Sequence, residues 1–244
     1  MKIALAPQCD IAEPPLRVGG LVPLTTTDYP GQLAAVVFCQ GCPWQCGYCQ
    51  NTHLIPVADK TDLPWENVRG FLQRRRGLLD AVVFSGGEPT LQPGLEAAML
   101  EAKEMGFRIG LHTAGTYPAR LKNLLPLLDW VGMDIKAPFD LYQRITHVPG
   151  SGAKALASAR HVLASGVAHE FRTTVHPALL SHENLRSLAH ELAGMGARNF
   201  VLQEFRQEGC ADESLNAQSA RGYLHPELLA EIGALFENFS VRRS

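Results

Sequence analysis

Apolar and polar positions follow two different periods along most of this chain. Short runs rich in β-branched residues predict six strands, at residues 34–39, 81–84, 108–113, 130–135, 170–175 and 200–205. Segments with helical spacing alternate with them and predict six helices, at residues 65–76, 94–105, 118–128, 153–165, 183–194 and 226–239. Six repeats of strand then helix predict an α/β fold with a parallel sheet and right-handed crossovers.

The number of repeats bounds the architecture. A complete eight-unit barrel takes about 250 residues, whereas this chain of 244 residues offers six units and two long ends. We therefore expect a single domain that forms a partial (β/α)6 TIM-like barrel, and a doubly wound open sheet is the alternative. We expect an irregular N-terminal lead-in over residues 1–20, the barrel over 21–206, and a C-terminal extension with one helix over 207–244.

Polar residues gather where the predicted strands end, which favours the barrel. In parallel barrels the carboxyl ends of the strands form the active-site rim. The residues at these ends are Cys42, Cys46, Cys49, Gly86, Gly87, Glu88, His112, Thr113, Asp134, Lys136, Arg172 and Gln203.

Composition excludes several classes of protein. The formal net charge of −2 gives no basic field for nucleic acid or an anionic membrane. No apolar run approaches the ~20 residues that span a bilayer, and the apolar start is too short for a signal peptide. Six cysteines in this context predict a reduced, cytoplasmic protein with a metal site. We expect Cys9 and Cys210, which lie far from the others, to be ordinary thiols.

Three thiols lie within eight residues directly after the first predicted strand, at Cys42, Cys46 and Cys49. Thiolates favour iron–sulfur clusters, zinc or cuprous copper. A [4Fe-4S] cluster normally takes four thiolates, so three would leave one iron open to a ligand. Cys39 allows a four-thiolate zinc site or closed cluster as the alternative, although zinc ribbons hold two well separated cysteine pairs.

The Cys-x3-Cys-x2-Cys loop with Tyr48 before its last cysteine resembles the mark of the radical S-adenosylmethionine (radical SAM) superfamily. Residues 28–31 (Asp-Tyr-Pro-Gly), 36–38, 48–51 and 84–89 look like its glycyl-radical-activating branch. Within that branch, the similarity to the activating proteins of anaerobic ribonucleoside-triphosphate reductase covers about residues 20–206.

This resemblance implies an oxidoreductase whose [4Fe-4S] cluster is bound by the three cysteines of the loop. Such an enzyme cleaves S-adenosylmethionine reductively, and the 5′-deoxyadenosyl radical removes hydrogen from a backbone glycine of a partner. The partner implied is a glycyl-radical enzyme, the large subunit of an anaerobic ribonucleotide reductase. The electron donor implied is a flavodoxin or ferredoxin, and neither nucleic acid nor membrane is involved. No side chain has to act as acid, base or nucleophile.

The Gly86-Gly87-Glu88 segment follows the second predicted strand. Two glycines permit close approach of a ligand to the backbone. The resemblance implies that this segment binds the methionine amino group and that Glu88 accepts the ammonium. The alternative is a tight strand–helix turn in which Glu88 lies at a helix N-terminus.

Asp134 and Lys136 alternate along a predicted strand and therefore share one face. The resemblance implies that they lie near the ribose and carboxylate of S-adenosylmethionine, and that Arg172 reaches the same carboxylate. The alternatives are a self-satisfied ion pair, and a pairing of Arg172 with Glu170 or Glu204. The remaining cofactor-binding residues implied are Tyr48, Thr113 and Gln203.

Two positions depart from the family pattern. Related activases tend to carry an acidic residue where His112 stands, and some bind a monovalent cation there, which His112 argues against. Gln50 stands where a histidine is common. Two other function classes therefore stay open: a radical SAM enzyme for a small purine- or pterin-type substrate, and a non-enzymatic iron–sulfur carrier.

Overall fold

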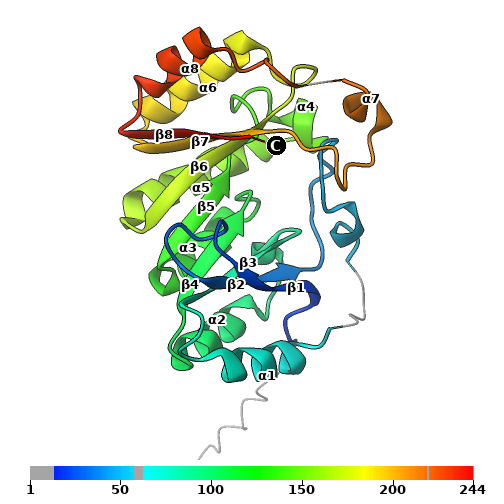
Figure 1. Cartoon of the computed structure of the whole chain (residues 1–244), viewed down its shortest axis with the longest axis vertical. Helices are drawn as coiled ribbons and strands as arrows, with labels where there is room; N and C mark the ends of the chain where they lie inside the picture. Colours follow the sequence, from blue (N-terminus) through cyan, green and yellow to red (C-terminus); the bar gives the residue numbers. More distant parts are fainter. Residues whose placement is uncertain (1–13, 58–62, 219, 244) are drawn as a thin grey trace, which may run out of the picture.

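A single curved sheet organises the chain. The structure is a computed structural model, which describes residues 14–57, 63–218 and 220–243. Eight strands follow one another in sequence order, from β1 at one edge to β8 at the other (Figure 1). β1 (Val18–Thr25) is antiparallel to β2, and every later pair is parallel. The other strands are β2 (Ala34–Cys39), β3 (Ala81–Gly86), β4 (Arg108–Thr113), β5 (Trp130–Asp134), β6 (Ala168–Val175), β7 (Asn199–Glu204) and β8 (Asn238–Arg242).

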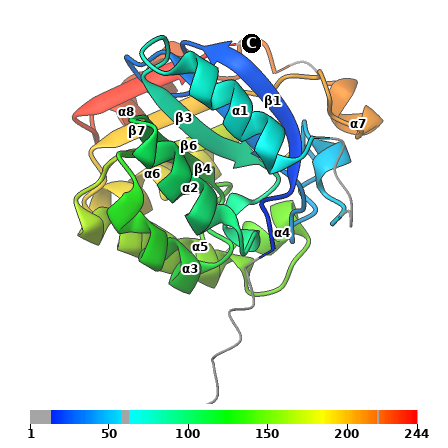
Figure 2. The same ribbon diagram turned by 90° about the horizontal axis from the view of Figure 1, so that it is seen from below.

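Helices cover the outer face of this sheet (Figures 1 and 2). Their buried sides pack on outward strand residues such as Val37, Phe84 and Phe171, and this layer forms the larger core. The covering helices are α1 (Trp65–Arg75), α2 (Leu95–Glu104), α3 (Pro118–Leu124), α5 (Ser151–Ser165), α6 (His182–Gly194) and α8 (Pro226–Gly233). The shorter elements are η1 (Thr52–Leu54), η2 (Pro89–Leu91), η3 (Leu125–Leu127), α4 (Tyr142–Thr146) and α7 (Glu213–Asn216).

A second, smaller core fills part of the inside of the sheet. The turn between β1 and β2 folds inward, and Tyr29 stacks on Trp130 with 5.3 Å between the ring centroids. Gly110 makes room for this ring, because a Cβ there would lie 3.1 Å from the Tyr29 ring. The inward turn therefore closes the lumen below the carboxyl ends of the strands.

The structure confirms the α/β fold and the six strand–helix units, whose strands are β2–β7. The doubly wound alternative is wrong, because the strands keep sequence order and the covering helices share one face. Two edge strands extend the predicted six-stranded sheet. β1 begins inside the expected irregular lead-in, where Gly19, Gly20 and Pro23 obscure the strand pattern.

The C-terminal extension differs most from its prediction. The helix expected over residues 226–239 ends at Gly233, and Asn238 to Arg242 form β8 beside β7. The prediction for Cys9, like most of the lead-in, lies outside the described residues. Among the helices in the described ranges, none has the length and apolar character needed to cross a bilayer.

Candidate active site

A cavity of about 610 Å³ lies where the strands end at their carboxyl side. Its volume is within the ~300–1,000 Å³ range of small-molecule sites. The structure brings nearly all the predicted site residues to its wall; Glu88, described below, is the exception. These lining residues are Cys42, Cys46, Tyr48, Cys49, Gly86, Gly87, Thr113, Asp134, Lys136, Arg172 and Gln203.

The cysteine loop leaves β2 and turns back on itself. The backbone N–H of Gly41 donates to the Leu54 carbonyl at 2.7 Å, and that of Cys42 donates to the Ile55 carbonyl at 3.0 Å. Gly41 has a φ of +96°, in the region where only glycine is unstrained. A further turn, from the Cys49 N–H to the Cys46 carbonyl at 3.0 Å, places all three thiols at the cavity.

The donor set fits an iron–sulfur cluster. All three thiols are free and half-buried. Burial raises the pKa of Cys42 to about 12, so this thiol is neutral until a metal displaces its proton. Within the described part of the chain, no three His, Cys, Asp or Glu side chains are arranged around a single ion. Thiolates of a cluster need not converge in this way, because each of them binds a different iron.

Cys39 does not join this set. It is fully buried in the outer core between sheet and helices, whereas the cavity lies on the inner side. Burial raises its pKa far above that of an ordinary thiol. The arrangement therefore gives no support to a four-thiolate site.

Gly86 and Gly87 bring β3 against the start of the cysteine loop. The Gly87 N–H donates to the Cys39 carbonyl, and the Glu88 N–H donates to the Gly41 carbonyl, both at 2.9 Å. A Cβ on either glycine would overlap the backbone of residues 38–41, and Gly86 has a φ of +105°. Glycine is thus needed at both positions for the packing of β3 against the cysteine loop, whether or not a ligand also approaches this backbone.

Glu88 lies behind the cavity wall, which differs from the expectation that it would meet a ligand. Its side chain is 0% exposed. Oε1 accepts from the Thr90 N–H (3.1 Å), the Thr90 hydroxyl (2.6 Å) and the Thr113 hydroxyl (2.7 Å), while Oε2 accepts from the Ala114 N–H (2.9 Å). Burial raises the pKa of Glu88, and these hydrogen bonds offset only part of that shift. The carboxylate therefore ties the end of β4 to the turn after β3.

Asp134, Lys136 and Arg172 form one charged group at the cavity. The Arg172 Nε and Nη2 atoms both lie 2.9 Å from Asp134 Oδ1, and Lys136 Nζ lies 3.9 Å from Oδ2. Both cations are nearly buried, whereas the Asp134 side chain is 39% exposed towards the cavity. Burial raises the pKa of Asp134, but Arg172 and Lys136 outweigh this and hold it below its usual range. Two cations share one carboxylate, so the group carries a net charge of +1 beside the cavity.

Aromatic side chains contact Lys136 of this charged group. Lys136 Nζ donates to the Tyr48 hydroxyl at 3.4 Å and lies 5.4 Å from the centroid of that ring. The Lys136 N–H donates to the Tyr142 hydroxyl at 2.9 Å, and Tyr142 packs edge-on against Trp44. The end of β5, helix α4 and the cysteine loop are thereby joined around one buried ammonium.

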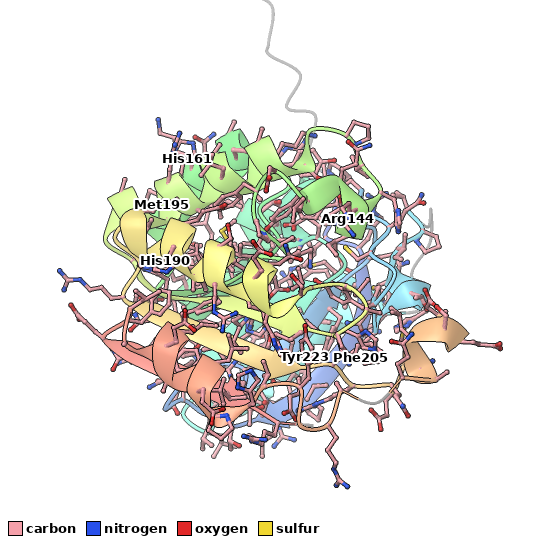
Figure 3. The ribbon with its side chains drawn as sticks, turned by 90° about the horizontal axis from the view of Figure 1, so that it is seen from above. Arg144, His161, His190, Met195, Phe205 and Tyr223 are labelled. Atoms are coloured by element: carbon pink, nitrogen blue, oxygen red, sulfur yellow. The ribbon has the colours of Figure 1, made fainter. Side chains whose placement is uncertain are left out.

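His112 is a neutral imidazole in the cavity wall. Burial, followed by the nearby Arg172, lowers its pKa to about 3. Nε2 lies 2.8 Å from the Asp28 carbonyl and must donate, so Nδ1 accepts from the Ser85 hydroxyl at 3.3 Å. His112 therefore binds the inward turn, and it does not supply the acidic group expected of a cation site. Histidines such as His161 and His190 lie on the outer helices α5 and α6 (Figure 3).

Arg206, which the sequence placed at the strand-end rim with Gln203, also lines the cavity, whereas Asp28, Thr174, Arg242 and Arg243 line it without having been predicted. Thr174 alternates with Arg172 along β6, so the strand period could have identified it. Arg242 and Arg243 reach the cavity because β8 pairs with β7, and the sequence predicted no strand after the helix expected over residues 226–239. Their ion pairs are with Glu170 at 2.8 Å and Glu204 at 3.5 Å.

Comparison with known proteins identifies the family. The profile of the radical SAM superfamily matches residues 36–192. A Methanocaldococcus jannaschii protein assigned as a glycyl-radical enzyme activating enzyme is 31% identical over 206 residues, which are 80% of this chain and 82% of that protein. The pyruvate formate-lyase-activating enzyme of Clostridium pasteurianum is 32% identical over 182 residues, 71% of this chain and 75% of that enzyme.

A solved structure shares the fold alone. Streptococcus suis SuiB, bound to its precursor peptide SuiA, matches 85% of this chain with a TM-score of 0.66 and 13% identity. This chain spans about half the length of SuiB, 48%.

Proposed function

This chain belongs to the radical SAM superfamily, and on that premise we propose that it activates a glycyl-radical enzyme, the large subunit of an anaerobic ribonucleotide reductase. Like its relatives it is an enzyme that uses a [4Fe-4S] cluster and S-adenosylmethionine. One observation carries the proposal: three thiols, the glycine edge of β3 and the Asp134 charge group meet at one cavity. The activating enzymes among its relatives support the class of partner.

The cysteine loop would hold the cluster. Cys42, Cys46 and Cys49 would bind three of its irons, one thiolate each. When bound, the cluster supplies one electron to the sulfonium of S-adenosylmethionine, which yields methionine and a 5′-deoxyadenosyl radical. The buried wall of Trp44 and Tyr48 would keep bulk water from this chemistry. A flavodoxin or ferredoxin is the electron donor that we propose.

The charged group would bind the amino-acid end of S-adenosylmethionine. A carboxylate entering the cavity can share Arg172 and Lys136 with Asp134, because these cations already lie beside an anion there. Asp134 would also accept from the ribose hydroxyls. Gly86 and Gly87 offer backbone groups to the amino end, and Tyr48, Thr113 and Gln203 complete the wall.

Glu88 has an indirect part in this proposal. Its oxygens are occupied by Thr90, Thr113 and Ala114, and the last two line the cavity. We therefore propose that Glu88 positions the ligand-binding edge of β4, and the backbone of the glycine turn takes the contact with the ammonium.

The open sheet supports a polypeptide substrate. In the described residues β1 and β8 are the sheet edges and do not pair with one another, so the barrel is not closed by a strand on that side. The choice of an anaerobic ribonucleotide reductase rests on the resemblance to its activating proteins over about residues 20–206. No side chain at the cavity needs to transfer a proton in the hydrogen abstraction, because the adenosyl radical accepts the hydrogen atom itself.

Anaerobic reconstitution tests the proposal. The reduced, reconstituted protein is mixed with S-adenosylmethionine and with the purified reductase subunit or pyruvate formate-lyase, and protein radicals are recorded by electron paramagnetic resonance. We expect a glycyl-radical doublet on the reductase with about one 5′-deoxyadenosine per radical, since each event consumes one S-adenosylmethionine. A Cys46→Ala variant is the control and should give neither. A doublet that appears on pyruvate formate-lyase and not on the reductase would replace the proposed partner by pyruvate formate-lyase. Turnover of a purine or pterin without a protein radical would refute the activase assignment.

A further inference from the structure

Residues 206–216, which we call the strap, lie across the cysteine loop after β7 ends. The strap begins next to Phe205, labelled in Figure 3, and contains α7, which lies beside the cysteine loop in Figures 1 and 2. The sequence predicted only a polar extension in this part of the chain. Apart from Arg206, which lines the cavity, the proposed chemistry assigns the strap no part.

Three contacts join the strap to the second half of the cysteine loop. Gln50 Nε2 donates to the Arg206 carbonyl at 3.0 Å, and the Cys210 thiol donates to the Gly47 carbonyl at 3.5 Å. Gly209 lies directly on the Gln50 carbonyl: its φ is +80°, and a Cβ there would overlap that oxygen. Gly47 lies within the turn from Cys46 to Cys49, and Gln50 follows that turn directly.

The strap is itself anchored to the barrel. Within the strap, the Asn216 amide donates to the Cys210 carbonyl at 3.0 Å and Asp212 accepts from the Leu215 N–H at 3.3 Å, so the strap folds as one unit. His176, which follows β6 and is fully buried, donates through Nε2 to the Leu215 carbonyl at 3.1 Å. Because its far end is held at the barrel, the strap can restrain the loop on which it lies.

The two halves of the cysteine loop have different supports. The first half is held by the Leu54 and Ile55 carbonyls, and by α4 through the Gln45 N–H, which donates to the Thr146 carbonyl at 3.1 Å. The second half, from Gly47 to Gln50, is held at Tyr48 by Lys136 and at Gly47 and Gln50 by the strap. A turn that must present two of three ligands is positioned best when it is ordered before the ligands bind.

We propose that the strap is a positioning element that holds the Cys46–Cys49 turn in its cluster-binding conformation before the cluster is inserted. The inference rests on the cluster that the family uses and not on the partner. Gly209 and Gln50 are the residues through which the strap would act, since one gives the closest backbone contact and the other a hydrogen bond.

The chain offers a matched pair of glycines to test this. Gly209→Ala and Gly222→Ala place the same side chain at a similar positive φ, +80° and +75°, but only the first meets the cysteine loop. Hydrogen exchange by mass spectrometry on the cluster-free protein, without S-adenosylmethionine or partner, measures the order of residues 42–51. We expect faster exchange over these residues in Gly209→Ala and wild-type exchange in Gly222→Ala. Equal exchange in both variants would overturn the proposal.

Gln50→Ala provides a second test that introduces no steric overlap, should Gly209→Ala fail to fold. It removes one hydrogen bond, so exchange over residues 46–50 should rise about twofold to tenfold. Iron release from the reconstituted variant to a chelator, followed by absorbance, should accelerate in the same ratio. Unchanged exchange and iron release would refute the role of the strap, whereas failure to activate any partner would bear only on the proposed function.

Discussion

Replacing Glu88 by glutamine tests whether this carboxylate is a structural anchor. The residue is 0% exposed, and its two oxygens accept four hydrogen bonds, two of them from the Thr90 and Ala114 backbone N–H groups, which can only donate. An amide must turn its NH2 towards at least one of these donors. If the amide nitrogen takes the position of Oε2, it faces the Ala114 N–H, which loses its acceptor, and the NH2 group itself is a further buried donor at that position.

The magnitude follows from opposing contributions. A lost hydrogen bond to a charged acceptor costs about 1.5–3 kcal/mol. Part of this free energy is recovered, because the neutral amide removes the cost of burying a charge. The raised pKa of Glu88 shows that burial disfavours its charged form. We expect a net loss of about 1–2 kcal/mol in the free energy of unfolding. Thr90→Val removes the hydroxyl that donates to Glu88 at 2.6 Å, and the double variant should show a coupling of about 0.5–2 kcal/mol.

Urea denaturation of the cluster-free protein under reducing conditions measures these values. Glu96→Gln, in the exposed first turn of α2, is the control; it should lose at most the ~0.3–1 kcal/mol of its helix-dipole interaction and show no coupling to Thr90→Val. S-adenosylmethionine binding to reconstituted Glu88→Gln should weaken through the displaced β4 edge. Wild-type stability with no coupling to Thr90, together with weakened binding, would refute the anchor and restore Glu88 as a direct ligand of the ammonium.

The remaining predictions concern the other walls of the cavity. Cys39→Ala should keep the cluster spectrum, whereas alanine at any of the three cavity thiols should abolish it; loss of the cluster with Cys39 alone would contradict the three-thiolate site. Arg172→Lys replaces a two-donor contact by one, so S-adenosylmethionine affinity measured by calorimetry should fall about tenfold. The pKa of His112 is about 3 in the folded protein and 6.5 ordinarily. Below pH 6.5 the unfolded chain therefore binds more protons than the folded protein, and the free energy of unfolding decreases as the pH is lowered. When the pH is lowered from 7 to 5, the free energy of unfolding of the cluster-free protein should decrease by about 2 kcal/mol more than that of the His112→Gln variant. Urea unfolding at each pH measures both proteins, and the same pH dependence in the two would refute the prediction.

Local sequence patterns were sufficient for the units of the fold. The predictions for β2 and β4 match the observed bounds, and α1 and α6 each differ by one residue. Their apolar spacing reflects which face is buried, and that is a property of neighbouring residues. The cysteine spacing likewise predicted three thiols at one site, since Cys42, Cys46 and Cys49 are close in the chain whatever the remainder does.

The parts that failed depend on residues far apart in sequence. β8 exists because β7 offers it an edge, and residues 234–239 carry helical and strand patterns at once. The assignment of Glu88 to a ligand stays a prediction, and the sequence could not show that Thr90, Thr113 and Ala114 already donate to its oxygens. Its buried position follows from the close packing of β3 against the start of the cysteine loop.

The sequence by itself determined the strand–helix alternation, the thiol triplet and the residue types at the strand ends. Only the tertiary structure decided which of those polar groups remain accessible to a ligand. Asp134 keeps 39% of its side-chain exposure although two cations bind it, whereas Glu88 keeps none. The physical reason is that burial and hydrogen-bond partners are set by segments as much as 163 residues apart, such as Gly47 and Cys210 of the strap, and no local pattern encodes them.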